Sequence, residues 1–186
     1  MESLIKKLFG RYFSNSSNFE NKKWKDIEYF SETWNLRIDL MAKYIVPNTF
    51  VVDFGCGPMW LKQKLPENCK YLGVDYIDRG EGSTKCDLNK KEFPTLSFDF
   101  AFVSGCLEYI EDYKWFIENI SKHSNRCIIS YCTTDFFSNL KERSECSWVN
   151  NLSKSDILAI FENYNWVLKD ETITETNNSI FFFEKY

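Results

Sequence analysis

The sequence predicts an α/β protein in which a parallel sheet carries helices on both faces. Short apolar runs typical of buried strands alternate with helical segments through the first two thirds of the chain. The chain has 186 residues, of which 44% are hydrophobic and 27% charged. That length and composition suit one globular domain with a sizeable core. We expect this domain over residues 24–186, with an N-terminal arm over 1–23.

The helices are predicted by apolar spacing and by their end signals. Ile27 to Ile45 place an apolar residue every three or four positions, and Pro47 ends the segment. A second helix is expected over 112–123, and a third over 153–164, which opens on a capping-box pattern.

The strands are predicted by short runs rich in β-branched and aromatic residues. They are expected at 50–54, 70–76, 85–87, 97–105, 126–132, near 166–172 and at 179–184. The third is short and weakly marked. The carboxyl ends of the first four share one edge of a parallel sheet, where ligands bind in such folds.

Charge and cysteine usage narrow the function classes. A net charge of -4 argues against nucleic acid as a partner. No apolar run approaches the roughly 18 residues of a membrane span, so no membrane partner is expected. Seven cysteines, an odd number without a C-x-x-C pair, indicate reduced thiols in a cytoplasmic protein, with no metal site.

The stretch TFVVDFGCGPMW, residues 49–60, ends a strand on two glycines one residue apart. Gly55 and Gly57 allow a tight turn and the close approach of a ligand to the backbone. A dinucleotide fingerprint needs a third glycine, but that position holds Trp60. In a dinucleotide site, the Asp53 carboxylate would lie near phosphates of the same charge. A cationic ligand suits this carboxylate better. The turn therefore favours a ligand other than a dinucleotide.

Two further acids end the next strands. Asp75 follows Gly55 by 20 positions (75 − 55), a distance at which a strand-end acid can accept both ribose hydroxyls. Asp87, together with the backbone of Leu88, can bind the amino group and a ring nitrogen of adenine. A cation, a ribose and an adenine are the three parts of S-adenosylmethionine, which we expect as the cofactor.

The segments VVDFGCGP, LGVDY, KCDL and FDFAFVSGCLEYIED, in this order, resemble the class I S-adenosylmethionine-dependent methyltransferases. The resemblance spans roughly residues 34–132, and it is to the small Rossmann-like members. It implies a seven-stranded, mostly parallel sheet whose last strand is antiparallel, and S-adenosylhomocysteine as the product. It also implies cofactor contacts at Asp53, Gly55, Cys56, Gly57, Asp75, Tyr76, Asp87, Leu88 and Ser104.

The sequence departs from these relatives at two places. Tyr109 stands where many relatives have a histidine base, and the segment between the second and third strands is too short for a full helix. Glu108 and Tyr109 are the candidate catalytic residues. Asp112 and Tyr131 are alternative bases, and a reaction without a base is also open.

The candidate substrate-binding residues are Arg37, Arg143, Trp148 and Asn150. Arg37 lies on the helix that often covers the cofactor in this superfamily, where it could pair with a carboxylate or simply face solvent. The other three follow the fifth strand, where relatives build the acceptor pocket.

These residues predict transfer of a methyl group to an oxygen or nitrogen of a small-molecule or glycan-type acceptor. One alternative is a non-catalytic subunit that keeps the fold, since a fold does not fix an activity. The other is a nicotinamide-dependent oxidoreductase, which Trp60 disfavours.

Overall fold

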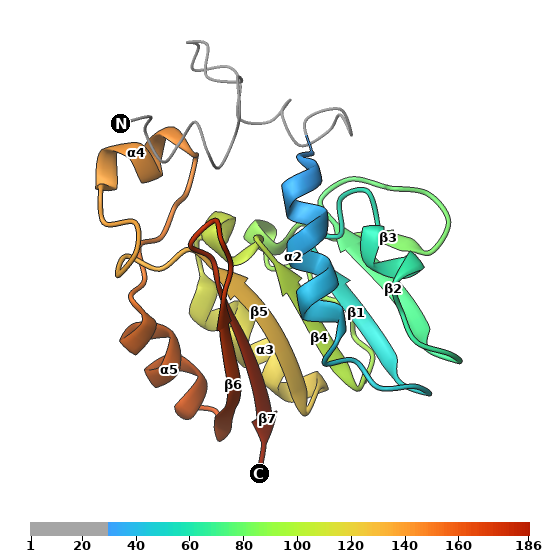
Figure 1. Cartoon of the computed structure of the whole chain (residues 1–186). Coiled ribbons are helices and arrows are strands. Elements are labelled where there is room, and N and C mark those ends of the chain that lie inside the picture. The colour runs from blue at the N-terminus through green and yellow to red at the C-terminus, as the bar shows by residue number, and fades with distance from the viewer. Residues whose placement is uncertain (1–29) are drawn as a thin grey trace.

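The computed structural model describes residues 30–186. The predicted arm over 1–23 and the first residues of the first predicted helix lie outside this range. The structure contains a seven-stranded sheet in the order β3-β2-β1-β4-β5-β7-β6 (Figure 1). The strands are β1 (Phe50–Phe54), β2 (Lys70–Asp75), β3 (Ser83–Lys85), β4 (Phe100–Ser104), β5 (Arg126–Tyr131), β6 (Trp166–Ile173) and β7 (Ser179–Lys185).

The first five strands are parallel, and the last two pair antiparallel. β7 inserts between β5 and β6 and runs antiparallel to both, whereas the pairs β1–β2, β1–β4, β2–β3 and β4–β5 are parallel. The predicted seven-stranded, mostly parallel sheet with an antiparallel last strand is therefore confirmed.

The helices are α2 (Glu32–Ala42), α3 (Tyr113–His123), α4 (Leu140–Glu145) and α5 (Lys154–Glu162). Successive strand residues point to opposite faces of the sheet, and the core divides accordingly. Val52 packs with side chains of α3 and α5, whereas Val51 packs with Met41 of α2. Figure 1 shows α2 on one face and α3 on the other. The prediction of helices on both faces is confirmed.

Most of the predicted elements occur within a few residues of their predicted limits. The Ser153–Asp156 capping box is present at the start of α5. The third strand lies at Ser83–Lys85 instead of 85–87, a shift that reflects a three-residue edge strand with little apolar pattern. The short helix α4 was not predicted. Between β2 and β3 a loop replaces the crossover helix, as expected.

The strand order places a topological switch point between β1 and β4. From β1 the chain continues outward to β2 and β3, and it then returns to the other side of β1 to form β4 and β5. The loops that follow β1 and β4 therefore leave the same edge in opposite directions and open a crevice there. The candidate site lies in this crevice.

Candidate functional site

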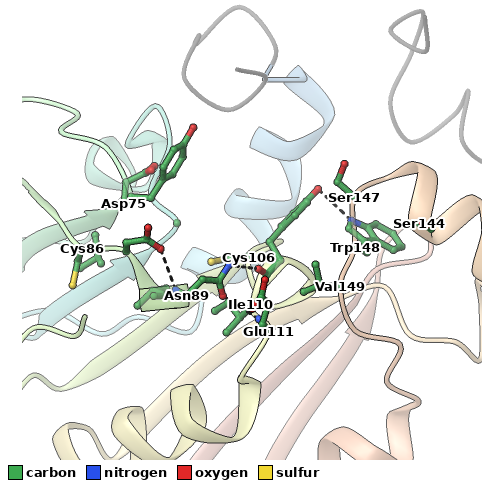
Figure 2. Close-up of a pocket in the computed structure, with 16 residues that line it drawn as sticks. Asp75, Cys86, Asn89, Cys106, Ile110, Glu111, Ser144, Ser147, Trp148 and Val149 are labelled. Atoms are coloured by element: carbon green, nitrogen blue, oxygen red, sulfur yellow. Dashed lines mark hydrogen bonds between the residues drawn. The ribbon is translucent and has the colours of Figure 1, made fainter. Parts of the chain in front are cut away.

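Two adjoining hollows lie at the carboxyl ends of β1, β2 and β4. The larger has a volume of about 500 Å³ and the smaller about 160 Å³. The residues common to both walls are Gly55, Asp75, Tyr76, Cys106 and Tyr109. In Figure 2, Asp75 and Cys86 lie at one end of the larger hollow, and Ser147, Trp148 and Val149 lie at the other.

Gly55 turns the chain over the end of β2. Its backbone has φ of +71°, a left-handed conformation that favours glycine, and its N–H donates to the carbonyl of Val74 at 2.8 Å. A Cβ at this position would lie 2.7 Å from Sγ of Cys106. The turn is therefore packed tightly against the residues that follow β4, and its backbone forms part of both walls.

Gly57 connects the turn to the acid of β2. Its φ is +47°, and its N–H donates to Oδ2 of Asp75 at 3.0 Å. A Cβ here would lie 2.5 Å from the ring of Phe30. Gly57 therefore positions Asp75 and leaves space for an aromatic ring, although it is absent from the walls of both hollows.

Asp75 is buried in an ion pair that the sequence did not reveal. Oδ2 also accepts from Nε of Arg79 at 3.0 Å, and each of the two side chains is only 5% exposed. The N–H of Ile77 reaches Oδ1 at 3.4 Å. The Arg79 guanidinium lies 5.8 Å from the centre of the Phe30 ring and lines the smaller hollow. The acid expected for ribose is thus at the site, with a buried cation beside it.

Asp53 lies beneath the site, away from both walls. It is 4% exposed, and Oδ2 accepts from the hydroxyl of Tyr71 at 2.9 Å. Burial raises the pKa of Asp53 to about 7, against the lowering effect of the Tyr71 hydrogen bond, and the charge of Asp75 raises it further. The predicted contact between Asp53 and a cationic ligand remains a prediction.

Asp87 and Leu88 line the larger hollow as the adenine assignment requires. Oδ1 of Asp87 accepts from the N–H of Asn89 at 3.1 Å, which caps a short 3-10 helix. The Asn89 side chain donates to the carbonyl of Tyr109 at 2.9 Å and accepts from the N–H of Glu111 at 3.0 Å. Asn89 therefore joins the loop after β3 to the turn after β4. It was not predicted, although it is only two residues from Asp87.

Glu108 is 2% exposed and lies behind the walls of the hollows. Oε1 accepts from the N–H of Cys132 at 3.1 Å, whereas Oε2 has no hydrogen-bond partner. Burial raises the pKa of this carboxyl, and Arg37 and Arg143 act in the opposite direction. Tyr109, the other candidate catalytic residue, lines both hollows.

Arg37 lines the smaller hollow and is held from two sides. Nε donates to the hydroxyl of Ser104 at 3.1 Å, and Nη1 donates to Oδ1 of Asn178 at 3.3 Å. Burial lowers the pKa of the guanidinium, and the charge of Glu108 raises it. The structure therefore places this cation in the crevice, at the end of β4.

Arg143 is completely buried, away from the hollows. Its five hydrogen bonds, at 2.7–3.3 Å, go to Asn151, Asn150, Tyr131 and the carbonyls of Cys132 and Phe137. Its guanidinium stacks 4.7 Å from the centre of the Trp148 ring. Arg143 therefore holds the segment after β5 in place and has no donor left for a substrate.

Trp148 lines the larger hollow, and its Nε1 donates to the hydroxyl of Tyr109 at 3.2 Å. Asn150 is buried instead: its amide donates to the carbonyls of Leu107 and Ile110. The segment after β5 thus contributes Trp148 to the site, while Asn150, like Arg143, holds the loop together.

The structure brings most of the predicted residues to the two hollows. The predicted residues that line them are Arg37, Gly55, Asp75, Tyr76, Asp87, Leu88, Ser104, Tyr109 and Trp148. Those behind the walls are Asp53, Cys56, Gly57, Glu108, Arg143 and Asn150. Lining residues that were not predicted include Phe30, Arg79, Cys86, Gly105, Cys106, Ile110, Glu111, Ser144, Ser147 and Val149. Gly105 could have been found, since it directly follows Ser104.

Comparison with solved structures establishes the fold. The chain superimposes on a Burkholderia thailandensis 1,6-didemethyltoxoflavin-N1-methyltransferase with S-adenosylhomocysteine bound, with a TM-score of 0.68 and 13% identity, covering 91% of this chain and 86% of that one. The fold is that of the class I methyltransferases. A magnesium protoporphyrin IX methyltransferase from Synechocystis has a TM-score of 0.63 and 15% identity, with coverage of 94% and 91%. A methyltransferase from Aquifex aeolicus has a TM-score of 0.67 and 13% identity, with coverage of 90% and 100%.

Comparison of the sequence alone identifies no relative of this chain. No family model matches the chain, and no curated protein matches its sequence.

Three further observations bear on the expected class of protein. Within residues 30–186, no helix combines the length and apolar character needed to cross a membrane. None of the seven cysteines is part of a disulfide bond. In that same part of the chain, no three histidine, cysteine or acidic side chains gather where they could hold a metal ion.

Proposed function

We propose that this chain is an S-adenosylmethionine-dependent methyltransferase that acts on a small-molecule or glycan-type acceptor. The observation that carries the proposal is the position of Asp75. This acid ends β2 in the common wall of two adjoining hollows, where a ribose would join an adenine in one hollow to an amino-acid chain in the other. The combined space lies within the range of ordinary ligand sites, about 300–1,000 Å³.

Each part of the cofactor has residues that fit it. Asp87 and Leu88 line the larger hollow, where they can bind the adenine edge. Ser104 and Arg37 line the smaller hollow, where the guanidinium can bind the methionine carboxylate. When bound, the cofactor supplies an electrophilic methyl group and leaves as S-adenosylhomocysteine.

The turn after β1 favours this cofactor over a nicotinamide dinucleotide. Pyrophosphate sites use the N-terminus of an α-helix that follows the glycine turn. Here the glycine turn leads only into a four-residue 3-10 helix, Trp60–Gln63. Without a helix of several turns, this position provides neither the aligned dipole nor the row of free N–H groups that a pyrophosphate needs.

The acceptor is expected at the end of the larger hollow that is formed by the segment after β5. Its walls there include Ser144, Ser147, Trp148 and Val149, which offer hydroxyl groups and an indole without a charge. Tyr109 lines both hollows and therefore lies close to where acceptor and methyl group would meet. Two structural neighbours are named as methyltransferases of small molecules, 1,6-didemethyltoxoflavin and magnesium protoporphyrin IX, which supports a small-molecule acceptor.

The contribution of the chain to the reaction is mainly positioning. An in-line transfer needs the acceptor atom and the methyl group held within about 3–3.5 Å of each other. Tyr109 and Trp148 are held to each other by a hydrogen bond, so they present a fixed wall to the acceptor. Glu108 is a candidate base only if Oε2, which lacks a partner, becomes accessible to the acceptor. Tyr109, Asp112 and Tyr131 are the other candidate bases, and a reaction without a base is the remaining alternative.

A transfer assay tests the proposal. Purified chain is incubated with S-adenosylmethionine labelled in the methyl group and a panel of hydroxylated or aminated heteroaromatics and oligosaccharides. We expect label in at least one acceptor, and loss of that transfer in Asp75→Ala.

A second candidate function is a non-catalytic binding subunit. It is favoured by the position of Glu108, which lies behind the walls with Oε1 bonded to the backbone of Cys132. Tight binding of S-adenosylhomocysteine with no labelled acceptor would support this candidate against the enzyme. A cytoplasmic location is part of the proposal in either case, because seven cysteines without a disulfide suit a reducing compartment.

A further inference from the structure

We propose that Asn178 is a positioning residue for cofactor binding: it fixes the Arg37 guanidinium so that this cation faces the carboxylate of the cofactor. The inference rests on the proposed function, because it concerns the amino-acid half of the same cofactor. Asn178 directly precedes β7 and lies outside the walls of both hollows. It therefore acts through Arg37, which lines the smaller hollow.

The turn between β6 and β7 lies at the edge of the sheet that holds the candidate site. β7 runs antiparallel to β5 and to β6, so the turn that joins β6 to β7 lies at the edge where β1, β4 and β5 end (Figure 1). There Oδ1 of Asn178 accepts from Nη1 of Arg37 at 3.3 Å. The two residues are 141 positions apart, so no local sequence pattern indicates this contact.

The Arg37 guanidinium lies directly over Gly105. A Cβ at Gly105 would be 2.5 Å from Nη2, 3.1 Å from Cζ and 3.3 Å from Nη1 of Arg37, and both residues line the smaller hollow. Nε donates to the hydroxyl of Ser104 at 3.1 Å. That single bond holds one end of the planar group, and the bond to Asn178 holds the other end. Two contacts from different elements therefore set the direction of the guanidinium.

Asn178 is itself fixed by the turn to which it belongs. It is 5% exposed, and its backbone N–H donates to Oγ1 of Thr174 at 3.0 Å. Its Nδ2 donates to the carbonyl of Thr176 at 3.3 Å and to Oγ1 of Thr176 at 3.2 Å. Because the amide nitrogen is directed at Thr176, the amide oxygen is left for Arg37. A cation held by such a preorganised acceptor loses less conformational freedom when its ligand binds.

The amide of Asn178 holds the guanidinium without neutralising its charge. An asparagine oxygen accepts a hydrogen bond but carries no net charge, whereas an aspartate in the same place would form an ion pair with Arg37. Within residues 30–186, no ion pair includes Arg37. The cofactor carboxylate can therefore become the ionic partner of this cation, in a charge-assisted hydrogen bond.

Calorimetric titration with two ligands tests the assignment. Wild type and Asn178→Asp are titrated with S-adenosylhomocysteine and with its decarboxylated analogue, which keeps the amino group but lacks the carboxylate. The aspartate keeps an acceptor for Nη1 of Arg37, but its charge competes with the ligand carboxylate. We expect Asn178→Asp to weaken binding of S-adenosylhomocysteine by roughly 10-fold, the worth of one charge-assisted hydrogen bond. We expect no loss of affinity for the analogue.

Asn177→Asp is the matched control. It makes the same chemical change in the same turn, one residue before Asn178. Asn177 lines neither hollow, and its backbone N–H donates to the carbonyl of Thr174 at 3.0 Å, a bond that the substitution keeps. This variant should bind both ligands with an affinity close to that of wild type. A loss as large as that of Asn178→Asp would mean that any added charge in the turn weakens binding, and it would contradict the inference.

A double substitution tests whether Asn178 acts through Arg37. Arg37→Ala should weaken binding of S-adenosylhomocysteine by roughly 10-fold or more. Adding Asn178→Asp to it should weaken binding no further, because two residues that act through one contact are not additive. Asn178→Ala removes the anchor without adding a charge. It should also show a loss for S-adenosylhomocysteine alone, and it decides the question if Asn178→Asp does not fold.

Three further results would overturn the inference. Binding of S-adenosylhomocysteine to Asn178→Asp as tightly as to wild type, or more tightly, would mean that Asn178 does not position Arg37 for a carboxylate. An equal loss for both ligands would mean that Asn178 only keeps the turn folded. A further loss in the Arg37→Ala background would mean that Asn178 acts by another route. Failure of the wild-type chain to bind S-adenosylhomocysteine is a different outcome, since it contradicts the proposed function and the inference with it.

Discussion

Substitution of Asp53 by asparagine should make the protein more stable at high pH. Asp53 is 4% exposed, and burial raises its pKa to about 7, whereas an aspartate in an unfolded chain has a pKa of about 3.9. The asparagine keeps an oxygen that can accept from the Tyr71 hydroxyl, which is 2.9 Å from Oδ2, and it removes the charge.

The sign follows from proton binding. Between about pH 4 and pH 7, the folded protein keeps the Asp53 proton while the unfolded chain has lost it, so the free energy of unfolding falls as the pH rises. The contribution of the neutral Asp53 carboxyl to the free energy of unfolding is present in full below about pH 4, and it is lost above about pH 7. Each pH unit corresponds to about 1.4 kcal/mol, so the full loss is of the order of 4 kcal/mol, of which about 3 falls between pH 5 and pH 8.

Urea unfolding of both proteins at pH 5, 6, 7 and 8 measures this effect as a difference. Titration of all other groups is common to the two proteins and cancels in the comparison. We expect the advantage of Asp53→Asn over wild type to grow by about 3 kcal/mol across this range. A difference that stays constant with pH would refute the reasoning, because it would mean that Asp53 is ionised in the folded protein throughout.

Three other substitutions give separate tests. Arg143→Ala should lower the free energy of unfolding by on the order of 3 kcal/mol, measured in urea, because several buried acceptors lose their donor; a near-neutral result would contradict its buried role. Gly57→Val should weaken S-adenosylhomocysteine binding in calorimetry, since a side chain there meets the Phe30 ring at 2.5 Å; unchanged affinity in a folded variant would place the ligand elsewhere. Asp75→Ala should weaken the same binding by roughly 10- to 100-fold and also lower the melting temperature, because Arg79 loses its buried partner; a variant that binds like wild type would remove the ribose assignment.

The fold could be predicted because its signals are local. Buried parallel strands such as FVVDF and RCIISY are short, mostly apolar runs, and the α5 capping box lies within four consecutive residues. The edge strand β3 and the six-residue helix α4 carry too few residues to show a period. Their limits depend on neighbours that are distant in sequence, so periodicity alone does not locate them.

The site could be predicted only in part, for a related reason. Acids at strand ends, such as Asp75 and Asp87, are visible as a pattern because parallel strands end at one edge. The role of Arg143 was not visible, since a basic residue among polar neighbours suggests an exposed side chain, whereas tertiary contacts bury it completely. Arg79 was missed because only the folded loop brings its guanidinium back to Asp75.

Calorimetric titration of the purified wild-type chain with S-adenosylhomocysteine and, separately, with NADH tests the central claim most directly. The adjoining hollows around Asp75 predict one molecule of S-adenosylhomocysteine per chain. The short 3-10 helix after the glycine turn predicts no measurable binding of NADH. Binding of NADH with no binding of S-adenosylhomocysteine would contradict the account, because the same crevice would then serve a dinucleotide.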